Sequence, residues 1–392
     1  MRVSTVLPVA DWRMCGAAAR TAETDGFDCV QSNELRHDPF APLAFAALAT
    51  ERVQLATSVA IAFPRSPMIV ANQAWDLHRH ARGRFVLGLG SQVKAHNERR
   101  FSVPWVAPAA RMGEYVQALR AIFRCWEWGE RLNYQGKHYR FTLMTPEFTP
   151  EPVGLPLPAI ALAAVGPLML KTAARQADSV RLHGFATRQY LEQVVRPVLE
   201  AELAAAGKSF SQFEVTGGGF IATGPDEAAV RAATEKIRYR VAFYGSTPAY
   251  RSVLDLHGLT DLGVRLNTLS REGKWHEMPS LVSDQTLDLF CARAPYEGLA
   301  DAVARRFGGL VDTVTLEFRP DDTAATRRRV IEAIQRIPHR FTGFPTASPV
   351  PLAEGGRGEG SITPTDAQCA PCTPDDAAAG RTIPAGAGSP GA

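Results

Sequence analysis

Three things are scarce in this sequence of 392 residues: excess charge of one sign, long apolar runs and patterned cysteines. The net charge is only +3, so a nucleic-acid partner, which needs a basic surface, is not expected. No apolar run approaches the roughly 20 residues that cross a bilayer, and the N-terminus lacks the apolar segment of a signal peptide. We therefore expect a cytoplasmic protein with no membrane contact.

The six cysteines form neither a disulfide framework nor a metal pattern. Cys369 and Cys372 make a single C-x-x-C with no second ligand pair nearby, so we predict no metal site and no redox centre. The other four stand among apolar neighbours and are predicted to be small buried hydrophobic residues: Cys15, Cys29, Cys125 and Cys291.

Short apolar segments alternate with helical ones along most of the chain, which favours βα units and a parallel sheet. One segment, Val53–Ile61, is β-branched with few charges, as expected of a strand buried on both faces. The count of strands predicts a TIM (β/α)8 barrel, with an open doubly wound sheet as the alternative. The predicted strands are Val3–Val9, Asp28–Ser32, Val53–Ile61, Arg84–Gly90, Ala159–Ala164, Asp178–His183, Phe213–Thr223 and Val311–Phe318.

Two long stretches interrupt the alternation, and a third ends it. Leu132–Pro158 is rich in Pro, Gly and aromatic residues and is predicted to form an ordered cover with a hairpin near Gly136. Arg240–Ala292 shows no clear strand and is predicted to be a helical insertion. Residues 345–392 have almost no large apolar side chains and cannot offset their ordering entropy. We therefore assign residues 1–344 to the barrel with insertions and 345–392 to a disordered low-complexity tail.

Candidate site residues follow from the rule that TIM barrels place their active sites at the carboxyl ends of the strands. Glu34 follows the second strand and His183 ends the sixth, so both are candidates for proton transfer or substrate orientation, or else structural hydrogen bonding. Gln92, after the fourth strand, is a candidate hydrogen-bonding partner. Gly88 and Gly90 allow either the close approach of a flat ring or phosphate, or a tight turn.

Other charged residues are predicted to be solvated. His78 and His80 are two residues apart on a helix, so they lie on different faces and cannot share a metal ion. The run Arg327–Arg329 in the last helix is interpreted as plain surface.

Several segments, in order, resemble the luciferase-like monooxygenase family over roughly Met1 to Phe318. The most specific is Gly83–Gly90, which reads GRFVLGLG; Gly26–Asp28, Thr57–Ala60 and Ala164–Pro167 add to it. Three further segments are similar to a branch that depends on the deazaflavin coenzyme F-420: His37–Phe40, Phe63–Pro67 and Glu98–Phe101.

The resemblance implies an isoalloxazine-type ring at the carboxyl-end mouth of the barrel. In the deazaflavin members a bulge in the third strand, often with a cis non-proline peptide, backs the ring, and that bond aligns with Ser58–Val59. The cofactor phosphate is expected at backbone N–H groups where the helix Leu168–Gln176 begins. The implied cofactor-binding residues are Ser58, Val59, Ala60, Gly88, Gly90, Ser91, Val165 and Gly166.

The resemblance does not extend to one substrate. A related sugar-phosphate dehydrogenase has a histidine where Glu34 stands and a glutamate where Val93 stands, so its mechanism is not carried over. We expect hydride transfer between coenzyme F-420 and a small organic substrate, and we expect the protein to form a homodimer. The alternatives are a two-component monooxygenase that uses FMN, and a non-catalytic flavin-binding barrel.

Overall fold

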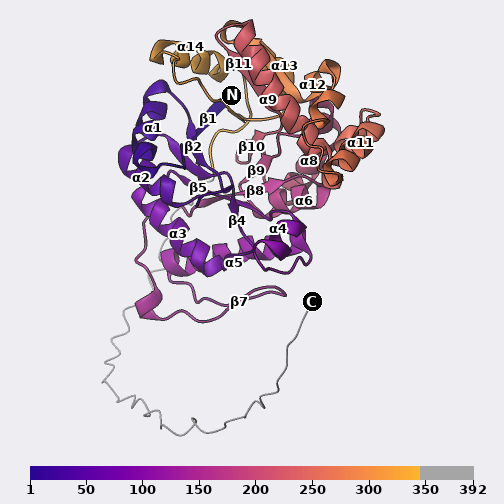
Figure 1. The fold of residues 1–392 in the computed structure, drawn as a ribbon. Coiled ribbons are helices and arrows are strands. Elements are labelled where there is room, and N and C mark those ends of the chain that lie inside the picture. The colour runs from indigo at the N-terminus through magenta and orange to yellow at the C-terminus, as the bar shows by residue number, and fades with distance from the viewer. Residues whose placement is uncertain (345–392) are drawn as a thin grey trace, which may run out of the picture. The chain divides into compact units, whose positions relative to one another are not determined.

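The structure, a computed structural model, describes residues 1–344, and its centre is a closed barrel of eight parallel strands (Figure 1). Pairing between β3 and β5 closes the ring, and β4 (Ala60–Ile61) extends the edge of β5. The closed ring confirms the predicted TIM barrel and rules out the open sheet. Around the ring the strands are β1 (Arg2–Val6), β2 (Cys29–Ser32), β3 (Gln54–Thr57), β5 (Phe85–Gly90), β8 (Ala159–Ala164), β9 (Ser179–Leu182), β10 (Glu214–Gly217) and β13 (Thr313–Thr315).

Capping side chains and glycines set the ends of helices around the barrel, as α1 shows. The Asp11 side chain accepts from the Arg13 N–H at the start of α1, and Gly26 ends that helix at φ 95°. The α5 side chains at helical spacing are buried, namely Tyr115, Leu119, Ile122, Phe123 and Trp126. The longer helices are α1 (Trp12–Asp25), α2 (Ala41–Ala49), α3 (Pro67–His80), α5 (Pro108–Trp128), α6 (Pro167–Gln176), α8 (Arg196–Ala205), α9 (Glu227–Gly245), α11 (Thr260–Arg271), α13 (Leu299–Phe307) and α14 (Ala324–Gln335). The shorter ones are α4 (Lys94–Arg99), α7 (Arg188–Tyr190), α10 (Arg251–Asp255) and α12 (Asp284–Phe290).

The predicted seventh strand, Phe213–Thr223, is wrong in its extent. Gly217 and Gly218, at φ 88° and 86°, turn the chain out of the barrel after β10. The following strand, β11 (Phe220–Gly224), pairs in parallel with β12 (Cys291–Pro295) in a separate two-stranded sheet. The end of Arg240–Ala292 therefore enters a strand that was not predicted, although the rest of that insertion is helical as expected.

The cover over residues 132–158 contains the expected hairpin, β6 (Tyr134–Gln135) against β7 (Arg140–Phe141). It also corrects the prediction for His78, which is buried while His80 is exposed. His78 Nε2 lies 2.7 Å from the carbonyl of Pro156, and burial lowers the pKa of the ring. The excursion thus covers a face of α3 that the helix alone would leave in solvent.

The arginine run in α14 is only partly plain surface. Arg328 and Arg329 are exposed, but Arg327 Nε lies 2.5 Å from Asp25 Oδ2, and that carboxylate is buried. Arg327 therefore ties the last helix to α1. Such a contact was missed because it joins residues 302 positions apart.

Two further predictions concern cysteines and membranes. Cys15, Cys29, Cys125 and Cys291 are all buried, as predicted, whereas Cys369 and Cys372 fall within 345–392, outside the described residues together with the predicted tail. Within residues 1–344, no helix combines the length and the apolar character needed to span a bilayer.

Candidate active site at the barrel mouth

The mouth of the barrel includes a break between β3 and β4. The peptide Ser58–Val59 is cis, as the family resemblance implied. The chain is held there by backbone hydrogen bonds, from the Ser58 N–H to the Ser32 carbonyl at 2.7 Å and from the Ala62 N–H to the Gly90 carbonyl at 2.9 Å. The predicted ring-backing residues Ser58, Val59 and Ala60 therefore lie between the ends of β2 and β5.

Gly88 and Gly90 lie inside β5, so the tight-turn alternative is wrong. A Cβ on Gly88 would come within 1.9 Å of the Thr57 carbonyl oxygen, and one on Gly90 within 2.6 Å of Val59 Cγ2. Thr57 Oγ1 also donates to the Gly88 carbonyl at 2.7 Å and accepts from its N–H at 2.8 Å. Because Gly88 and Gly90 have no side chains, the neighbouring segment at Thr57 and Val59 can lie close against β5.

Glu34 is held in a network that joins two loops of the mouth. One carboxylate oxygen accepts from the Ile61 N–H at 2.7 Å and from Arg65 Nη1 at 2.8 Å, and the other accepts from Arg65 Nη2 at 3.0 Å. Arg65 also lies 3.7 Å from Asp38, whose carboxylate accepts from the N–H groups at the start of α2. Because Arg65 meets Glu34 in a two-pronged pair, this carboxylate is fixed in position.

His183 follows β9 and sits beneath two tyrosines supplied by the insertion. Its ring centroid lies 4.3 Å from that of Tyr244 and 4.7 Å from that of Tyr250. Nδ1 accepts from the Phe185 N–H at 3.0 Å, which places the proton of the neutral ring on Nε2. Burial lowers the pKa of His183 to about 4, so the ring is neutral at pH 7. The sequence did not reveal the two tyrosines because the insertion carries no recognisable motif.

Ser91 and Gln92 form the turn between β5 and α4. Gln92 lies in the left-handed region at φ 58°, and its side-chain oxygen accepts from the Val93 N–H at 2.9 Å. The buried Asn97 donates to the Ser91 carbonyl at 2.8 Å and so anchors the turn from α4. The polar oxygen of Gln92 is thereby committed to the backbone, while its amide nitrogen has no partner within residues 1–344.

The predicted phosphate-binding segment has unpaired backbone donors. Gly166 precedes α6 as its N-cap, and a Cβ built on it would meet no atom within 4 Å, so the space beside it is open. The N–H groups of Val165 and Gly166 donate to no acceptor in the part of the chain that the structure describes. The Val165 carbonyl accepts from the Tyr190 hydroxyl at 3.3 Å. Open space, free N–H groups and a helix N-terminus together suit an anion.

The alternation along β9 adds Arg181, a residue that was not among the candidates from the sequence. Ser179 points into the barrel, where its hydroxyl reaches Glu214 at 3.4 Å, and residues two apart on a strand share a face. Arg181 therefore points inward below His183, and its side chain is buried beside Gly88. Its Nε has no hydrogen-bond partner in the described residues. The sequence signal that could have identified Arg181 is its position two residues before His183, which follows the same strand.

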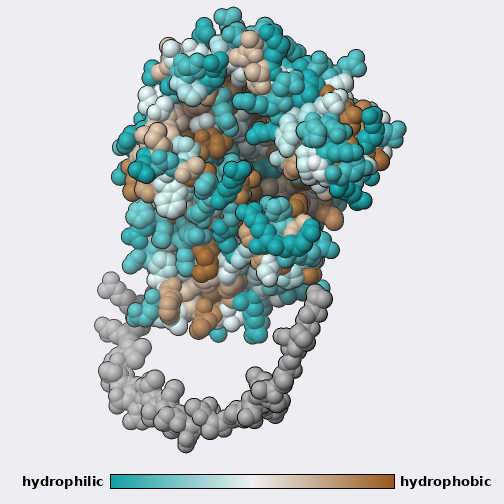
Figure 2. All heavy atoms as spheres, in the orientation of Figure 1, coloured by the Kyte–Doolittle hydropathy of each residue, from teal (hydrophilic) through white to brown (hydrophobic). Residues whose placement is uncertain are grey.

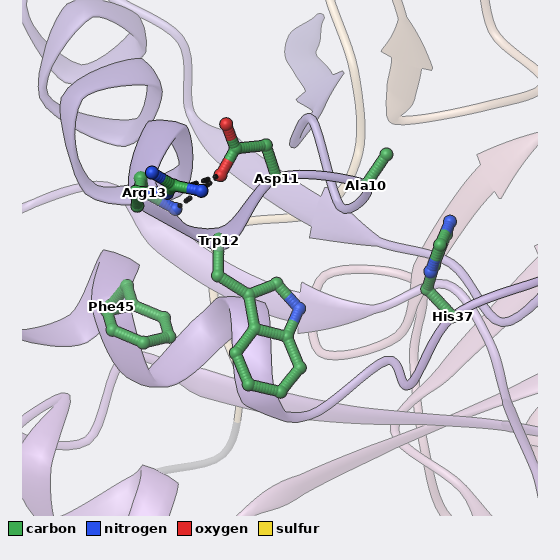
Figure 3. Close-up of a pocket in the computed structure, with 6 residues that line it drawn as sticks. All are labelled: Ala10, Asp11, Trp12, Arg13, His37 and Phe45. Atoms are coloured by element: carbon green, nitrogen blue, oxygen red, sulfur yellow. Dashed lines mark hydrogen bonds and ion pairs between the residues drawn. The ribbon is translucent and has the colours of Figure 1, made fainter.

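A hollow of about 540 Å³ lies elsewhere, where the loops after β1 and β2 meet the starts of α1 and α2 (Figure 3). Trp12 and Phe45 line it with ring centroids 6.0 Å apart, while His37 lies apart from them, and Asp11 is already paired with exposed Arg13. The space-filling view also shows a recess between the side that carries α1 and α2 and the side that carries α11 (Figure 2). Since the Figure 3 hollow contains no unpaired buried polar group, we place the candidate site at Gly88, Arg181 and His183 instead.

Comparison with known proteins agrees with this architecture. The model of the luciferase-like monooxygenase family matches residues 2–315. The chain is 44% identical over 318 residues to the Mycobacterium tuberculosis protein named Uncharacterized protein Rv1360, covering 81% of this chain and 92% of that one. It is 29% identical over 290 residues to a putative coenzyme F-420-dependent oxidoreductase, Rv3520c, of the same organism, covering 68% and 80%.

Two solved structures share the fold. The coenzyme F-420-dependent tetrahydromethanopterin reductase of Methanopyrus kandleri has a TM-score of 0.68 at 19% identity, covering 86% of this chain and 97% of that one. The oxygenating constituent of 3,6-diketocamphane monooxygenase from Pseudomonas putida, in complex with FMN, has a TM-score of 0.57 at 15% identity, covering 86% and 97%. At these identities the likeness shows the fold alone.

The chain belongs to the luciferase-like monooxygenase family, an enzyme family of oxidoreductases and monooxygenases. Its relatives and structural neighbours include proteins named for coenzyme F-420 and one solved with FMN. What these cofactors share is a flavin-like ring.

Proposed function

We propose that the protein transfers a hydride between coenzyme F-420 and a small organic substrate at the mouth of the barrel. The observation that carries the proposal is the set of unpaired polar groups gathered there: the N–H groups of Val165 and Gly166, the proton-bearing Nε2 of His183 and the guanidinium of Arg181. The bound deazaflavin would supply the hydride chemistry, which no side chain can perform alone.

The proposed roles follow the geometry. Val165 and Gly166 would bind the cofactor phosphate at the start of α6, and Ser58, Val59 and Ala60, with Gly88, Gly90 and Ser91 behind them, would back the ring. His183 would donate a hydrogen bond through Nε2 to a substrate oxygen and orient it, with Tyr244 and Tyr250 excluding water. Glu34 would hold β4 in place through Arg65, and Gln92 would offer its free amide nitrogen.

The first test is a titration of the purified protein with F-420 and with FMN, followed by fluorescence. Selective tight binding of F-420 is the expected result, and turnover would then be sought by screening small alcohols and ketones for a change in deazaflavin absorbance. Preference for FMN would contradict the cofactor assignment. Binding of neither cofactor would contradict the enzyme proposal as a whole.

The second candidate is a two-component FMN-dependent monooxygenase, because the same fold is found in a monooxygenase solved with FMN. Both cofactors carry a phosphate and a tricyclic ring, so the groups described above would suit either. Oxygen consumption with supplied reduced FMN distinguishes this candidate from the first. A non-catalytic flavin-binding barrel would bind a cofactor and show no turnover with any donor or acceptor. The cytoplasmic location and the homodimer stay predictions.

A further inference from the structure

Arg181 is a buried cation without a counterion. Its relative exposure is 7%, its Nε has no hydrogen-bond partner, and no carboxylate lies within 4 Å of its guanidinium among residues 1–344. The side chain occupies space that Gly88 leaves free, since a Cβ on Gly88 would lie 3.1 Å from Arg181 Nε. The guanidinium therefore lies inside the barrel, below His183 and beside the strands that flank the Ser58–Val59 peptide.

The groups that could pair with Arg181 are already engaged or uncharged. Glu214, two residues along from the register partner of Arg181 on β10, accepts from Arg2 at 2.7 Å and from the Thr313 hydroxyl at 2.6 Å. Burial raises the pKa of Cys29 to about 12, so that thiol is neutral. The register partner itself, Thr216, is buried with an unpaired hydroxyl. Arg181 Nε and the Thr216 hydroxyl are thus both buried without a hydrogen-bond partner among residues 1–344.

We propose that Arg181 binds the electron-rich edge of the cofactor ring from inside the barrel, below the mouth, and that it binds the reduced form of the cofactor more tightly than the oxidised form. This inference rests on the proposed function and adds a residue to it. A hydride from the substrate C–H bond would bring two electrons and one proton to a bound ring, and the pyrimidinedione edge of that ring would offer Arg181 an adjacent carbonyl oxygen and nitrogen as acceptors. A planar guanidinium matches two such neighbouring acceptors without any proton transfer.

The energetic reason is that an unpaired charge in a protein interior is costly unless a ligand completes it. In the free protein Arg181 bears that cost, and in the complex the anionic ring edge would remove it. Arg181 would be a binding residue for the ring, not a proton donor. A carboxylate-bearing substrate offers the same oxygen chemistry, and the experiment below separates the two sources.

The experiment compares the wild type with Arg181→Met, Arg181→Lys and the surface control Arg329→Met. Dissociation constants for oxidised and for reduced F-420 are measured anaerobically by fluorescence and absorbance titration, or for the two forms of FMN if the wild type prefers FMN. For Arg181→Met we expect affinity for the reduced form to fall at least about tenfold more than affinity for the oxidised form. Arg181→Lys should retain part of the difference, and Arg329→Met should match the wild type.

The melting temperature of the cofactor-free protein provides a second readout. Because methionine fills similar space without charge, Arg181→Met should melt a few degrees above the wild type. A purely structural role for Arg181 predicts a lower melting temperature and an unchanged ratio of the two dissociation constants, and that result would overturn the inference. Equal loss of both redox forms would also overturn it.

The remaining outcomes are equally decisive. If Arg181→Met leaves both cofactor affinities intact but abolishes stabilisation by millimolar benzoate in a thermal shift assay, the ring assignment is wrong and the substrate is the anion. If the wild type binds neither F-420 nor FMN, the proposed function fails and the inference fails with it. If the wild type binds a cofactor but Arg181→Met leaves the ratio of the two dissociation constants unchanged, the inference is wrong and the proposed function is not affected.

Discussion

The two ends of the same barrel treat buried charge in opposite ways. At the amino ends of the strands, here called the floor, three carboxylates are paired with backbone N–H groups: half-buried Asp28 accepts from Val3 at 2.8 Å, half-buried Asp178 from Ile160 at 2.9 Å, and buried Asp312 from Val215 at 2.8 Å. At the mouth, Arg181 and the N–H groups of Val165 and Gly166 have no partner within residues 1–344.

The difference teaches which family motifs are structural. Asp28, Asp178 and Asp312 each precede a strand and bind the backbone of the neighbouring strand in the same way. The Gly26–Asp28 segment, which carried part of the resemblance, therefore stabilises the floor, as do Asp178 and Asp312. In TIM barrels the floor contributes to stability and the mouth to function, and the pairing of charges here follows that division.

The largest effect is expected where floor and mouth meet, at Gly88. Gly88→Ala would drive a Cβ to 1.9 Å from the Thr57 carbonyl oxygen, and backbone cannot rotate away as a side chain can. We expect a loss of about 3 kcal/mol or more in the free energy of unfolding, measured by urea denaturation. The matched control is Gly113→Ala in α5, where the nearest atom would lie at 3.6 Å and stability should hold or rise. Equal stability of the two variants would contradict this account of β5.

Next comes the floor. Asp312→Ala leaves three backbone donors without their acceptor, those of Val215, Arg340 and Phe341. We expect a loss of about 2–3 kcal/mol, since each buried unpaired donor costs roughly 1–3 kcal/mol and water can reach some of them. Asp321→Ala, which removes an exposed ion pair with Arg319, should cost under about 0.5 kcal/mol. Cofactor affinity should change in neither variant, and a selective loss in Asp312→Ala would break the division between floor and mouth.

A smaller effect is expected at Glu34, a carboxylate of the mouth that is paired with Arg65. Glu34→Gln keeps the shape of the side chain but removes the charge opposite Arg65 at 2.8 Å. We expect a loss of about 1–2 kcal/mol in thermal or urea unfolding, because both partners are largely buried. The control is Glu151→Gln, whose exposed pair with Arg79 should contribute almost nothing. If Glu34→Gln lowers turnover without lowering stability, Glu34 is a catalytic residue and not a clamp.

The smallest effect concerns pH and His183. Burial lowers the pKa of His183 from its ordinary value of 6.5 to about 4. The unfolded chain therefore binds this proton more readily than the folded one between these values, so stability should fall as the pH is lowered from about 6.5 towards 4. At pH 5.5 the contribution is on the order of 1 kcal/mol.

His183→Gln should reduce this loss, measured as the difference in urea midpoint between pH 7 and pH 5.5. His276→Gln provides the control, because that ring is exposed. An identical pH dependence in wild type and His183→Gln would show that the pKa of His183 is the same in the folded and unfolded chains, and would contradict the lowering of that pKa by burial.

Much of the fold could be predicted from the sequence because its signals are local. The strand Ala159–Ala164 was predicted with the bounds that the structure has, and the predicted helix Leu168–Gln176 differs from α6 by one residue at its start. The prediction failed at Phe213–Thr223 because Gly217 and Gly218 turn the chain between β10 and β11, and the sequence does not show whether a glycine adopts a positive φ. It failed at His78 because that ring is buried by an excursion more than 50 residues away in the sequence. The excursion supplies the Pro156 carbonyl as a hydrogen-bond partner.

The candidate site was predicted in outline only. Strand ends pointed to Glu34, His183 and Gln92, but their partners Arg65, Tyr244 and the Val93 N–H were not foreseen. Arg181 was passed over because an arginine within an apolar strand gives no sign of whether a counterion awaits it.

The sequence by itself determined the order of βα units, the buried cysteines and the family, since each depends on residue type and short-range periodicity. Only the tertiary structure decided which charges are paired, because pairing depends on distances across the barrel. Arg2 and Glu214 are 212 positions apart and meet at 2.7 Å, while Arg181, on the strand next to that of Glu214, is left without an anion. This difference in charge pairing separates the floor, which stabilises the barrel, from the mouth, where we propose that the cofactor binds.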